Sequence, residues 1–174
     1  MPTSDWLDPG TVVNADDGNT NWSNPSNAGD GTNATEAGIS LPKNGVSEYL
    51  ECSNFTWPTG MTALNGIEFR QVHYADSPAS GIFQTEFNSF DSGGNHANQA
   101  TGEEWTAQTE ETFTFGGPTD TLGLALGDLD SSAGCRSKVV GSITSARTGK
   151  IYYIQARVYY EGGGDDITVN FINT

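Results

Sequence analysis

Hydrophobic and polar residues alternate over short stretches of this chain, with the period of two that is typical of β-strands. The stretch around residue 68 shows the pattern, since Ile67 and Phe69 alternate with Glu68 and Arg70. No long window places apolar residues three and four positions apart, as an amphipathic helix requires. Strands are therefore expected at residues 34–41, 48–55, 63–74, 81–90, 104–109, 111–115, 119–126, 138–146, 150–160 and 167–172.

Polar turns separate these stretches. The chain contains 22 Gly and 14 Asn, residues that readily adopt the positive φ angles of turns. Residues 91–104 are expected to form a polar loop, and residues 147–149 are expected to close a hairpin between 138–146 and 150–160. In the second strand of that hairpin, one face is expected to hold Tyr152, Ile154, Ala156, Val158 and Tyr160.

This spacing predicts an all-β fold, an antiparallel two-sheet β-sandwich that is jelly-roll-like, with about 8–10 strands and long polar loops. A length of 174 residues suits one domain with a substantial core. Residues 1–10 carry Trp6 and Leu7 among Asp, Pro and Gly, and are expected to form an arm that stays mobile or docks on a neighbour. Residues 11–174 are expected to form the single β-sandwich domain.

Charge is unevenly distributed along the chain. The net charge is −15, yet residues 131–174 contain five bases against three acids. A field of this sign repels nucleic acid, so nucleic-acid binding is not expected. No apolar run is long enough to cross a membrane, and residues 1–5 lack the basic and apolar regions of a secretory signal. The five bases could meet an acidic partner or could be solvated strand residues: Arg136, Lys138, Arg147, Lys150 and Arg157.

Two cysteines, Cys52 and Cys135, lie far apart in the sequence. Two cysteines in a chain of this length do not form a disulfide framework. Because Cys52 lies in a strand-like run, a buried free thiol is expected there. A disulfide between the two is possible only if their strands adjoin.

Catalytic residues are not indicated. Asp91-Ser92-Gly93-Gly94 is similar to the nucleophile segment of chymotrypsin-like proteases, but neither His73 nor His96 has the sequence setting of their catalytic base. Adjacent acids on a strand point to opposite faces and so do not form the facing pair of a glycosidase. The sequence therefore predicts a protein that is not an enzyme and needs no cofactor.

Residues 14–33 form a long polar stretch, which in a small domain is expected to be functional or fixed in place. A calcium ion is a weak possibility because Ca²⁺ prefers oxygen-rich loops, although no Glu closes an EF-hand pattern. The calcium candidates are Asp16, Asp17, Asn19 and Asp30. A structural brace is the alternative interpretation: Trp22 would pack under the loop while Asn24 and Asn27 bond to turn backbone.

Several segments, in order, resemble a β-sandwich module of tailed-bacteriophage virion proteins. The resemblance covers about residues 10–160. Its segments are Trp22-Ser23-Asn24-Pro25-Ser26-Asn27-Ala28, Asp30-Gly31, Ala34-Thr35, Tyr49-Leu50-Glu51-Cys52-Ser53-Asn54-Phe55, Pro58-Thr59-Gly60, Leu64-Asn65-Gly66-Ile67-Glu68-Phe69, Gly116-Gly117-Pro118-Thr119-Asp120 with the apolar-Gly pair Leu122-Gly123, and Arg157-Val158-Tyr159-Tyr160. Residues 128–132 and 162–174 depart from the pattern.

The resemblance implies a virion structural role. The leading hypothesis is a decoration (cement) protein on the outside of the phage head, made in the host cytoplasm and binding the major capsid protein and copies of itself as a homotrimer. The candidate partner contacts are Trp6, Leu7, Arg136, Lys138 and Arg157.

The alternative hypothesis is a tail or fibre module that recognises host surface glycans. Jelly rolls bind sugars through exposed aromatic rings and loop amides, and the candidates here are Trp57, Trp105 and Tyr74. Each of these three could instead be a core aromatic. Glycans are expected as partners only under this alternative.

Overall fold

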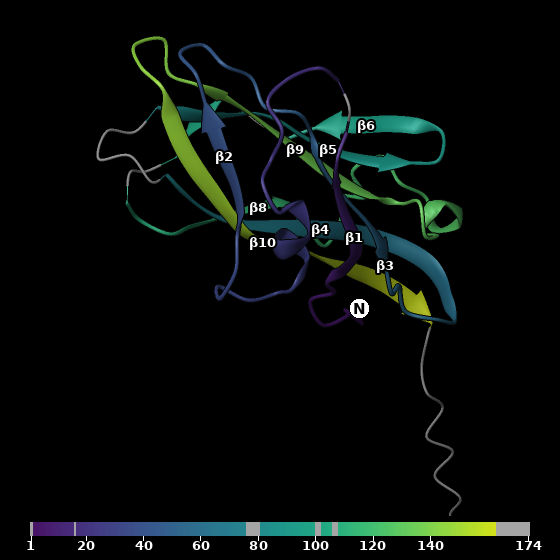
Figure 1. Ribbon diagram of the computed structural model, residues 1–174. Helices are drawn as coiled ribbons and strands as arrows, with labels where there is room; N and C mark the ends of the chain where they lie inside the picture. Colours follow the sequence, from purple (N-terminus) through teal and green to yellow (C-terminus); the bar gives the residue numbers. More distant parts are fainter. Residues whose placement is uncertain (1, 16, 76–80, 100–101, 106–107, 163–174) are drawn as a thin grey trace, which may run out of the picture.

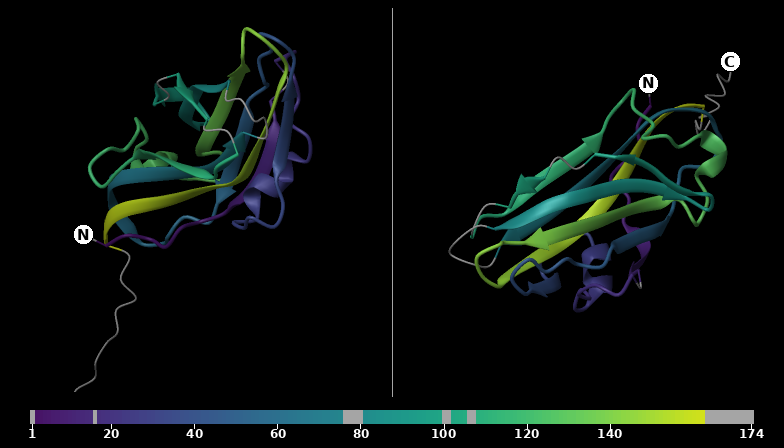
Figure 2. Two further views of the ribbon diagram at one scale, coloured as in Figure 1. Left: turned by 90° about the vertical axis from the view of Figure 1, so that its left-hand side faces the viewer. Right: turned by 90° about the horizontal axis from the view of Figure 1, so that it is seen from above.

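In the computed structural model, residues 2–15, 17–75, 81–99, 102–105 and 108–162 are described. Two antiparallel sheets pack face to face (Figures 1 and 2). The predicted all-β sandwich is confirmed. The strand expected at 167–172 lies outside the described residues.

Sheet A consists, in spatial order, of β2 (Ala37–Leu41), β10 (Arg147–Gly162), β4 (Met61–Ala75) and β8 (Glu111–Gly116). Sheet B consists of β1 (Pro9–Asn14), β3 (Leu50–Phe55), β9 (Gly134–Gly141), β5 (Ile82–Asp91) and β6 (Gly94–Asn98), and β7 (Glu103–Glu104) also pairs with β5. Each sheet pairs early strands with late ones, as in a jelly roll. Two 3₁₀ helices, η1 (Pro25–Gly29) and η2 (Leu126–Asp128), lie in the connections, and neither is long enough to cross a membrane.

The core lies between the two sheets and is made largely of side chains that alternate with outward residues along each strand, with further side chains from the connections. Burying a large apolar side chain stabilises the fold by roughly 1.5–3 kcal/mol. The largest fully buried apolar side chains include Trp22, Leu41, Leu50, Ile67, Phe69, Ile82, Phe87, Trp105, Leu122, Ile151 and Ile154.

The hairpin predicted around residues 147–149 is wrong. β9 pairs with β3 and β5 in sheet B, whereas β10 pairs with β2 and β4 in sheet A. Residues 142–146 therefore cross from one sheet to the other. Alternation shows that a segment is a strand but does not show which strand it pairs with.

Several further segments differ from expectation, among them β1 (Pro9–Asn14), which is a strand where none was expected. Residues 119–126 form no strand, because Leu122 and Gly123 have φ angles of 52° and 80°, which no strand accommodates. Gly94–Asn98 is an edge strand inside the expected polar loop, held by backbone pairing that needs no apolar side chain. The strand expected at 104–109 overlaps β7 (Glu103–Glu104), which pairs with β5, while residues 106 and 107 lie outside the described part of the chain.

Cys52 and Cys135 lie directly opposite each other on β3 and β9. Both are buried and both are free thiols, so the buried free thiol expected at Cys52 is confirmed. Burial first, and then the neighbouring Cys52 thiol, raises the pKa of Cys135.

Candidate functional site

The outer face of sheet A is built from alternate residues of its two central strands, β4 and β10. On β10 the inward side chains Ile154, Ala156 and Val158 are fully buried. Because successive strand residues point to opposite faces, the residues between and beside them point outward. These outward residues are Tyr153, Gln155, Arg157 and Tyr159.

A β-bulge adds one more tyrosine to this face. The register between β10 and β4 shifts between Ile151 and Tyr153, which makes Tyr152 an extra residue on its strand. Ile151 and Ile154 both stay in the core, while Tyr152 and Tyr153 are both partly exposed. The prediction that Tyr152 shares the buried face is therefore wrong. Its ring lies 6.5 Å, between centroids, from the ring of Tyr74 on β4.

The N-terminal arm lies along the edge of β10 beyond its pairing with β2. Leu7 and Ala156 exchange two backbone hydrogen bonds of 2.7 and 3.0 Å, and the Ser4 amide donates to the carbonyl of Val158 at 3.0 Å. The chain start accordingly lies beside the end of β10 (Figures 1 and 2). The arm thus acts as an additional edge strand of sheet A.

Trp6 connects this arm to the outward residues of β4 and β10. The guanidinium groups of Arg70 and Arg157 lie 4.2 and 4.4 Å from its ring centroid. Each also lies 5.4 Å from a tyrosine ring, Arg70 from Tyr153 and Arg157 from Tyr159. Aromatic rings and guanidinium groups therefore alternate along the sheet, an arrangement favoured by cation–π attraction.

We call this surface the aromatic face. Tyr152 and Tyr159 are separated by roughly 20–23 Å of strand, at about 3.3 Å per residue. Its aromatic members are Trp6, Tyr74, Tyr152, Tyr153 and Tyr159.

Glu68 on β4 binds two outward side chains of β10 at one end of the aromatic face. Its carboxylate accepts hydrogen bonds from Arg157 Nε at 2.5 Å and from the Tyr159 hydroxyl at 2.7 Å. Burial and then the bond to Glu68 raise the pKa of Tyr159. Partial burial lowers the pKa of Arg157, but the hydrogen bond and charge of Glu68, together with Tyr159, outweigh it and the net shift is upward. The positive charge of Arg157 is thus compensated by the carboxylate of Glu68.

Arg70 has a different partner. Its Nε donates to the amide oxygen of Gln155 at 2.7 Å, and one terminal nitrogen donates to the same oxygen. The Gln155 amide nitrogen in turn donates to Asp8 at 2.6 Å. The side chain of Gln155 therefore separates the guanidinium of Arg70 from the carboxylate of Asp8.

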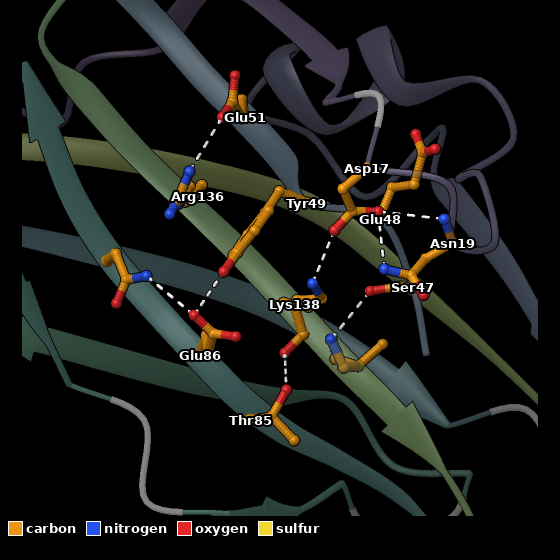
Figure 3. A network of polar contacts seen from close by, with 12 residues as sticks. Asp17, Asn19, Ser47, Glu48, Tyr49, Glu51, Thr85, Glu86, Arg136 and Lys138 are labelled. Carbon is orange, nitrogen blue, oxygen red and sulfur yellow. Dashed lines mark hydrogen bonds and ion pairs between the residues drawn. The ribbon is translucent and has the colours of Figure 1, made fainter. Parts of the chain in front are cut away.

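The outer face of sheet B is a polar network centred on Tyr49 (Figure 3). Arg136 and Lys138 on β9 lie 3.8 and 4.4 Å from the Tyr49 ring centroid, and the Tyr49 hydroxyl donates to Glu86 at 2.5 Å. Burial first, and then the bond to Glu86, raises the pKa of Tyr49.

Both cations of this network meet acids of the same chain. Arg136 lies 3.6 Å from Glu51, and Lys138 forms a 2.7 Å ion pair with Asp17 in the loop after β1. Burial raises the pKa of Asp17, but the bonds from Lys138 and Asn19 together with the Lys138 charge outweigh it, and the net shift is downward. The network attaches the polar loop to sheet B and compensates the charges of Arg136 and Lys138.

The five candidate partner contacts fall into two groups. Trp6 and Arg157 meet on the outer face of sheet A, beside which Leu7 pairs with β10. Arg136 and Lys138 meet at Tyr49 on the outer face of sheet B. The sequence named all five but did not indicate that they lie on opposite faces of the sandwich.

The brace candidates lie in and around η1. Trp22 is 2 % exposed, and its indole N–H donates to the carbonyl of Glu48 at 3.0 Å. Asn27 donates from its side chain to the carbonyl of Glu36. Asn24 has a φ angle of 49° before η1, and its side chain forms no capping bond there. These contacts attach the polar stretch to the sheets.

The calcium candidates that the structure describes form hydrogen bonds or ion pairs within the chain. Asp17 pairs with Lys138 and Asn19, and Asp30 accepts bonds from Thr32 and Thr35. Asp16 lies outside the described residues. In the part of the chain that is described, no three His, Cys, Asp or Glu side chains are grouped as metal ligands.

The three glycan candidates lie in different places. Tyr74 belongs to the aromatic face. Trp57 packs against Phe55, with ring centroids 5.1 Å apart, and its indole N–H donates to the Asp130 carbonyl. Trp105 is fully buried in the core, so it is a core aromatic and is not available on the surface.

Sequence reasoning missed Tyr152, Tyr153, Tyr159 and Arg70 as surface residues of one site. A signal was present, because β10 alternates Tyr153, Gln155, Arg157 and Tyr159 with apolar residues. That alternation identifies an outward face rich in aromatic and hydrogen-bonding groups.

Two of the segments that carry the virion resemblance pack against each other. The amide of Ile67 donates to the carbonyl of Asp120 at 2.9 Å, and the amide of Gly117 donates to the carbonyl of Ile67 at 3.0 Å. A Cβ at Gly66 would lie 2.1 Å from the carbonyl oxygen of Gly117, so this contact requires glycine. These backbone contacts hold the two segments together, and Glu68 of the first segment also lies on the aromatic face.

No protein-family model matches this chain, and no curated protein matches its sequence. Several solved structures are similar in fold, among them the three described next. A carbohydrate-binding module of type CBM4 has a TM-score of 0.43 and 13% identity, covering 88% of this chain and 94% of its own. The CBM22-1 xylan-binding domain of Xyn10C from Paenibacillus barcinonensis has a TM-score of 0.43 and 9% identity, covering 89% of this chain and 86% of its own. TmCBM61, solved with β-1,4-galactotriose, has a TM-score of 0.39 and 12% identity, covering 90% and 88%. At these values none of the three assigns a residue or a ligand to this chain.

Proposed function

We propose that this chain is a non-catalytic module that recognises glycans through the aromatic face of sheet A. The observation that supports the proposal is the row of partly exposed rings along β10, flanked by side chains that form hydrogen bonds. Aromatic faces stack on the C–H faces of sugar rings, since they combine large apolar area with little conformational entropy. Amide, guanidinium and carboxylate groups beside them fix the hydroxyls and provide specificity.

The sequence resemblance supports a place for such a module on a phage particle. Under this proposal it is a tail or fibre module, and its ligand is a glycan on the host surface. The extended row favours an oligosaccharide chain over a single sugar, because successive rings of a chain can contact successive aromatic residues.

Head decoration remains the other proposal for the same chain. It requires a surface that binds a capsid shell. The residues proposed to form that surface already interact with other residues of this chain. Arg136 and Lys138 pair with acids of sheet B and the loop after β1, and Trp6 packs against two arginines of sheet A. Co-sedimentation with emptied phage shells tests it, with saturable binding as the supporting result.

The glycan proposal predicts the effect of removing rings from the aromatic face. Tyr153→Ala and Tyr159→Ala should each weaken oligosaccharide binding about tenfold, because each loses roughly 50 Å² of apolar contact with the ligand. An oligosaccharide array identifies a ligand, and isothermal titration calorimetry measures the affinities.

Tyr49→Ala is the matched control, since Tyr49 is also a partly exposed tyrosine beside cations but lies on the outer face of sheet B. It should bind the ligand like the unmodified protein. Equal loss of binding in all three variants would place the ligand elsewhere, and an array without any bound glycan would count against the function itself.

A further inference from the structure

The cations of the aromatic face differ in how their charges are balanced. Arg157 forms a 2.5 Å ion pair with Glu68, and Lys150 lies 3.2 Å from Glu36. Arg70 has no carboxylate within ion-pair distance in the described part of the chain. It lies between Trp6 and Tyr153, in the middle of the row.

Arg70 also keeps hydrogen-bonding capacity. Its Nε and one terminal nitrogen both donate to a single neutral acceptor, the amide oxygen of Gln155. The other terminal nitrogen forms no hydrogen bond with the described residues. A guanidinium has five N–H donors in a planar fork that matches the oxygens of a carboxylate or sulfate. The Gln155 contact thus orients the group while leaving donors for a ligand.

The net negative charge of the whole protein makes Arg70 stand out as a local site of attraction for an anion. With a net charge of −15, the surrounding field repels anions. A guanidinium that no carboxylate neutralises, held by stacking on a sheet face, is a point where one negative group of a ligand is attracted. Its hydrogen-bond partner Gln155 is buried, and the local dielectric there is lower than in water, which strengthens the attraction.

We infer that the aromatic face binds an acidic glycan, whose carboxylate or sulfate group is held by Arg70 while neighbouring sugar rings contact Trp6 and Tyr153. The inference rests on the proposed glycan-binding function and specifies its ligand class. It goes beyond that function, because aromatic stacking alone does not distinguish neutral from acidic sugars.

The first test needs no variant. Calorimetric titrations compare a neutral oligosaccharide with oligosaccharides of the same length that carry either hexuronate units or sulfate esters. A charge-assisted bond predicts an affinity for one acidic series roughly ten- to a hundredfold above the neutral one. The two acidic arms identify whether a carboxylate or a sulfate is preferred.

The second test assigns the preference to Arg70. Arg70→Gln should abolish the acidic preference, so that acidic and neutral oligosaccharides bind this variant equally, and Arg70→Lys should keep part of the preference because the charge remains without the fork. Lys43→Gln removes the same charge from an exposed loop and should change nothing. Near-ultraviolet circular dichroism checks that each variant is folded.

The outcomes separate the inference from the function. Equal affinity for neutral and acidic oligosaccharides, or an acidic preference that survives in Arg70→Gln, overturns the inference and leaves glycan binding standing. Failure of every series to bind overturns both.

Discussion

His73 is a buried ionisable side chain between the two sheets. Its ring stacks on Trp105 with centroids 4.3 Å apart and meets the edge of Phe113 at 4.2 Å. Burial lowers the pKa of His73 to about 4, although Glu111, whose carboxylate oxygen lies 3.5 Å from Nε2, acts in the opposite direction. At neutral pH the ring is therefore uncharged and behaves as an aromatic core residue.

This pKa predicts a loss of stability in mild acid. Below about pH 6.5 the unfolded chain binds a proton at this residue that the folded chain does not bind until about pH 4. The free energy of unfolding should fall by up to about 1.4 kcal/mol per pH unit across that window. Urea titrations at several pH values measure it. His73→Phe should show a shallower dependence, and identical slopes in both proteins would assign the effect to other groups.

β9 approaches its neighbour β3 unusually closely at one end. A Cβ at Gly134 would lie 1.9 Å from the carbonyl oxygen of Cys52, which is backbone and has little freedom to move. Gly134 also pairs with Phe90 on β5, so the strand is confined on both sides. The close approach of β3 and β9 thus requires glycine at position 134. A side chain there would collide with the backbone of β3.

Gly134→Ala should lower the free energy of unfolding by about 1–3 kcal/mol, because an added methyl group overpacks a closed site. Gly127→Ala is the matched control: a Cβ there meets no atom within 4 Å, and its stability should change little. Chemical denaturation of both variants measures the difference. Equal stability of the two would show that β3 and β9 separate at no cost.

The N-terminal arm joins the two sheets of the sandwich. Residues 3–7 pair with β10 of sheet A, and the chain then continues directly into β1 of sheet B. The arm covers an edge of β10 that would otherwise present unpaired backbone groups, and such edges promote association.

Deleting residues 2–7 should lower the free energy of unfolding by roughly 1–3 kcal/mol, from the lost backbone bonds and the lost contacts of Trp6. It should also increase self-association through the exposed edge. Trp6→Ala retains the backbone pairing and should not increase association beyond that of the intact chain. Light scattering after size exclusion, with urea titration, measures both effects. If the deletion behaves like the full chain, the arm contributes neither stability nor edge protection.

Alternation predicted most strands of this sandwich but only part of the candidate site. β4, β5, β8 and β10 lie close to their expected ranges, because a strand with one face in the core records that face in its own sequence. Tyr74 was identified as a surface aromatic, and Trp6 and Arg157 as contact residues. The contact of Trp6 with both Arg157 and Arg70 was not predicted, because these three residues come from the arm, β10 and β4.

The sequence by itself determined the all-β class and the excess of acidic residues, because these follow from local periodicity and composition. Only the tertiary structure decided that β9 and β10 belong to different sheets, that a bulge turns Tyr152 outward, and that Arg70 lies between Trp6 and Tyr153. Strand pairing depends on contacts between segments far apart in the chain, and a one-residue register shift reverses the face of every following side chain. The aromatic face is a product of that long-range pairing.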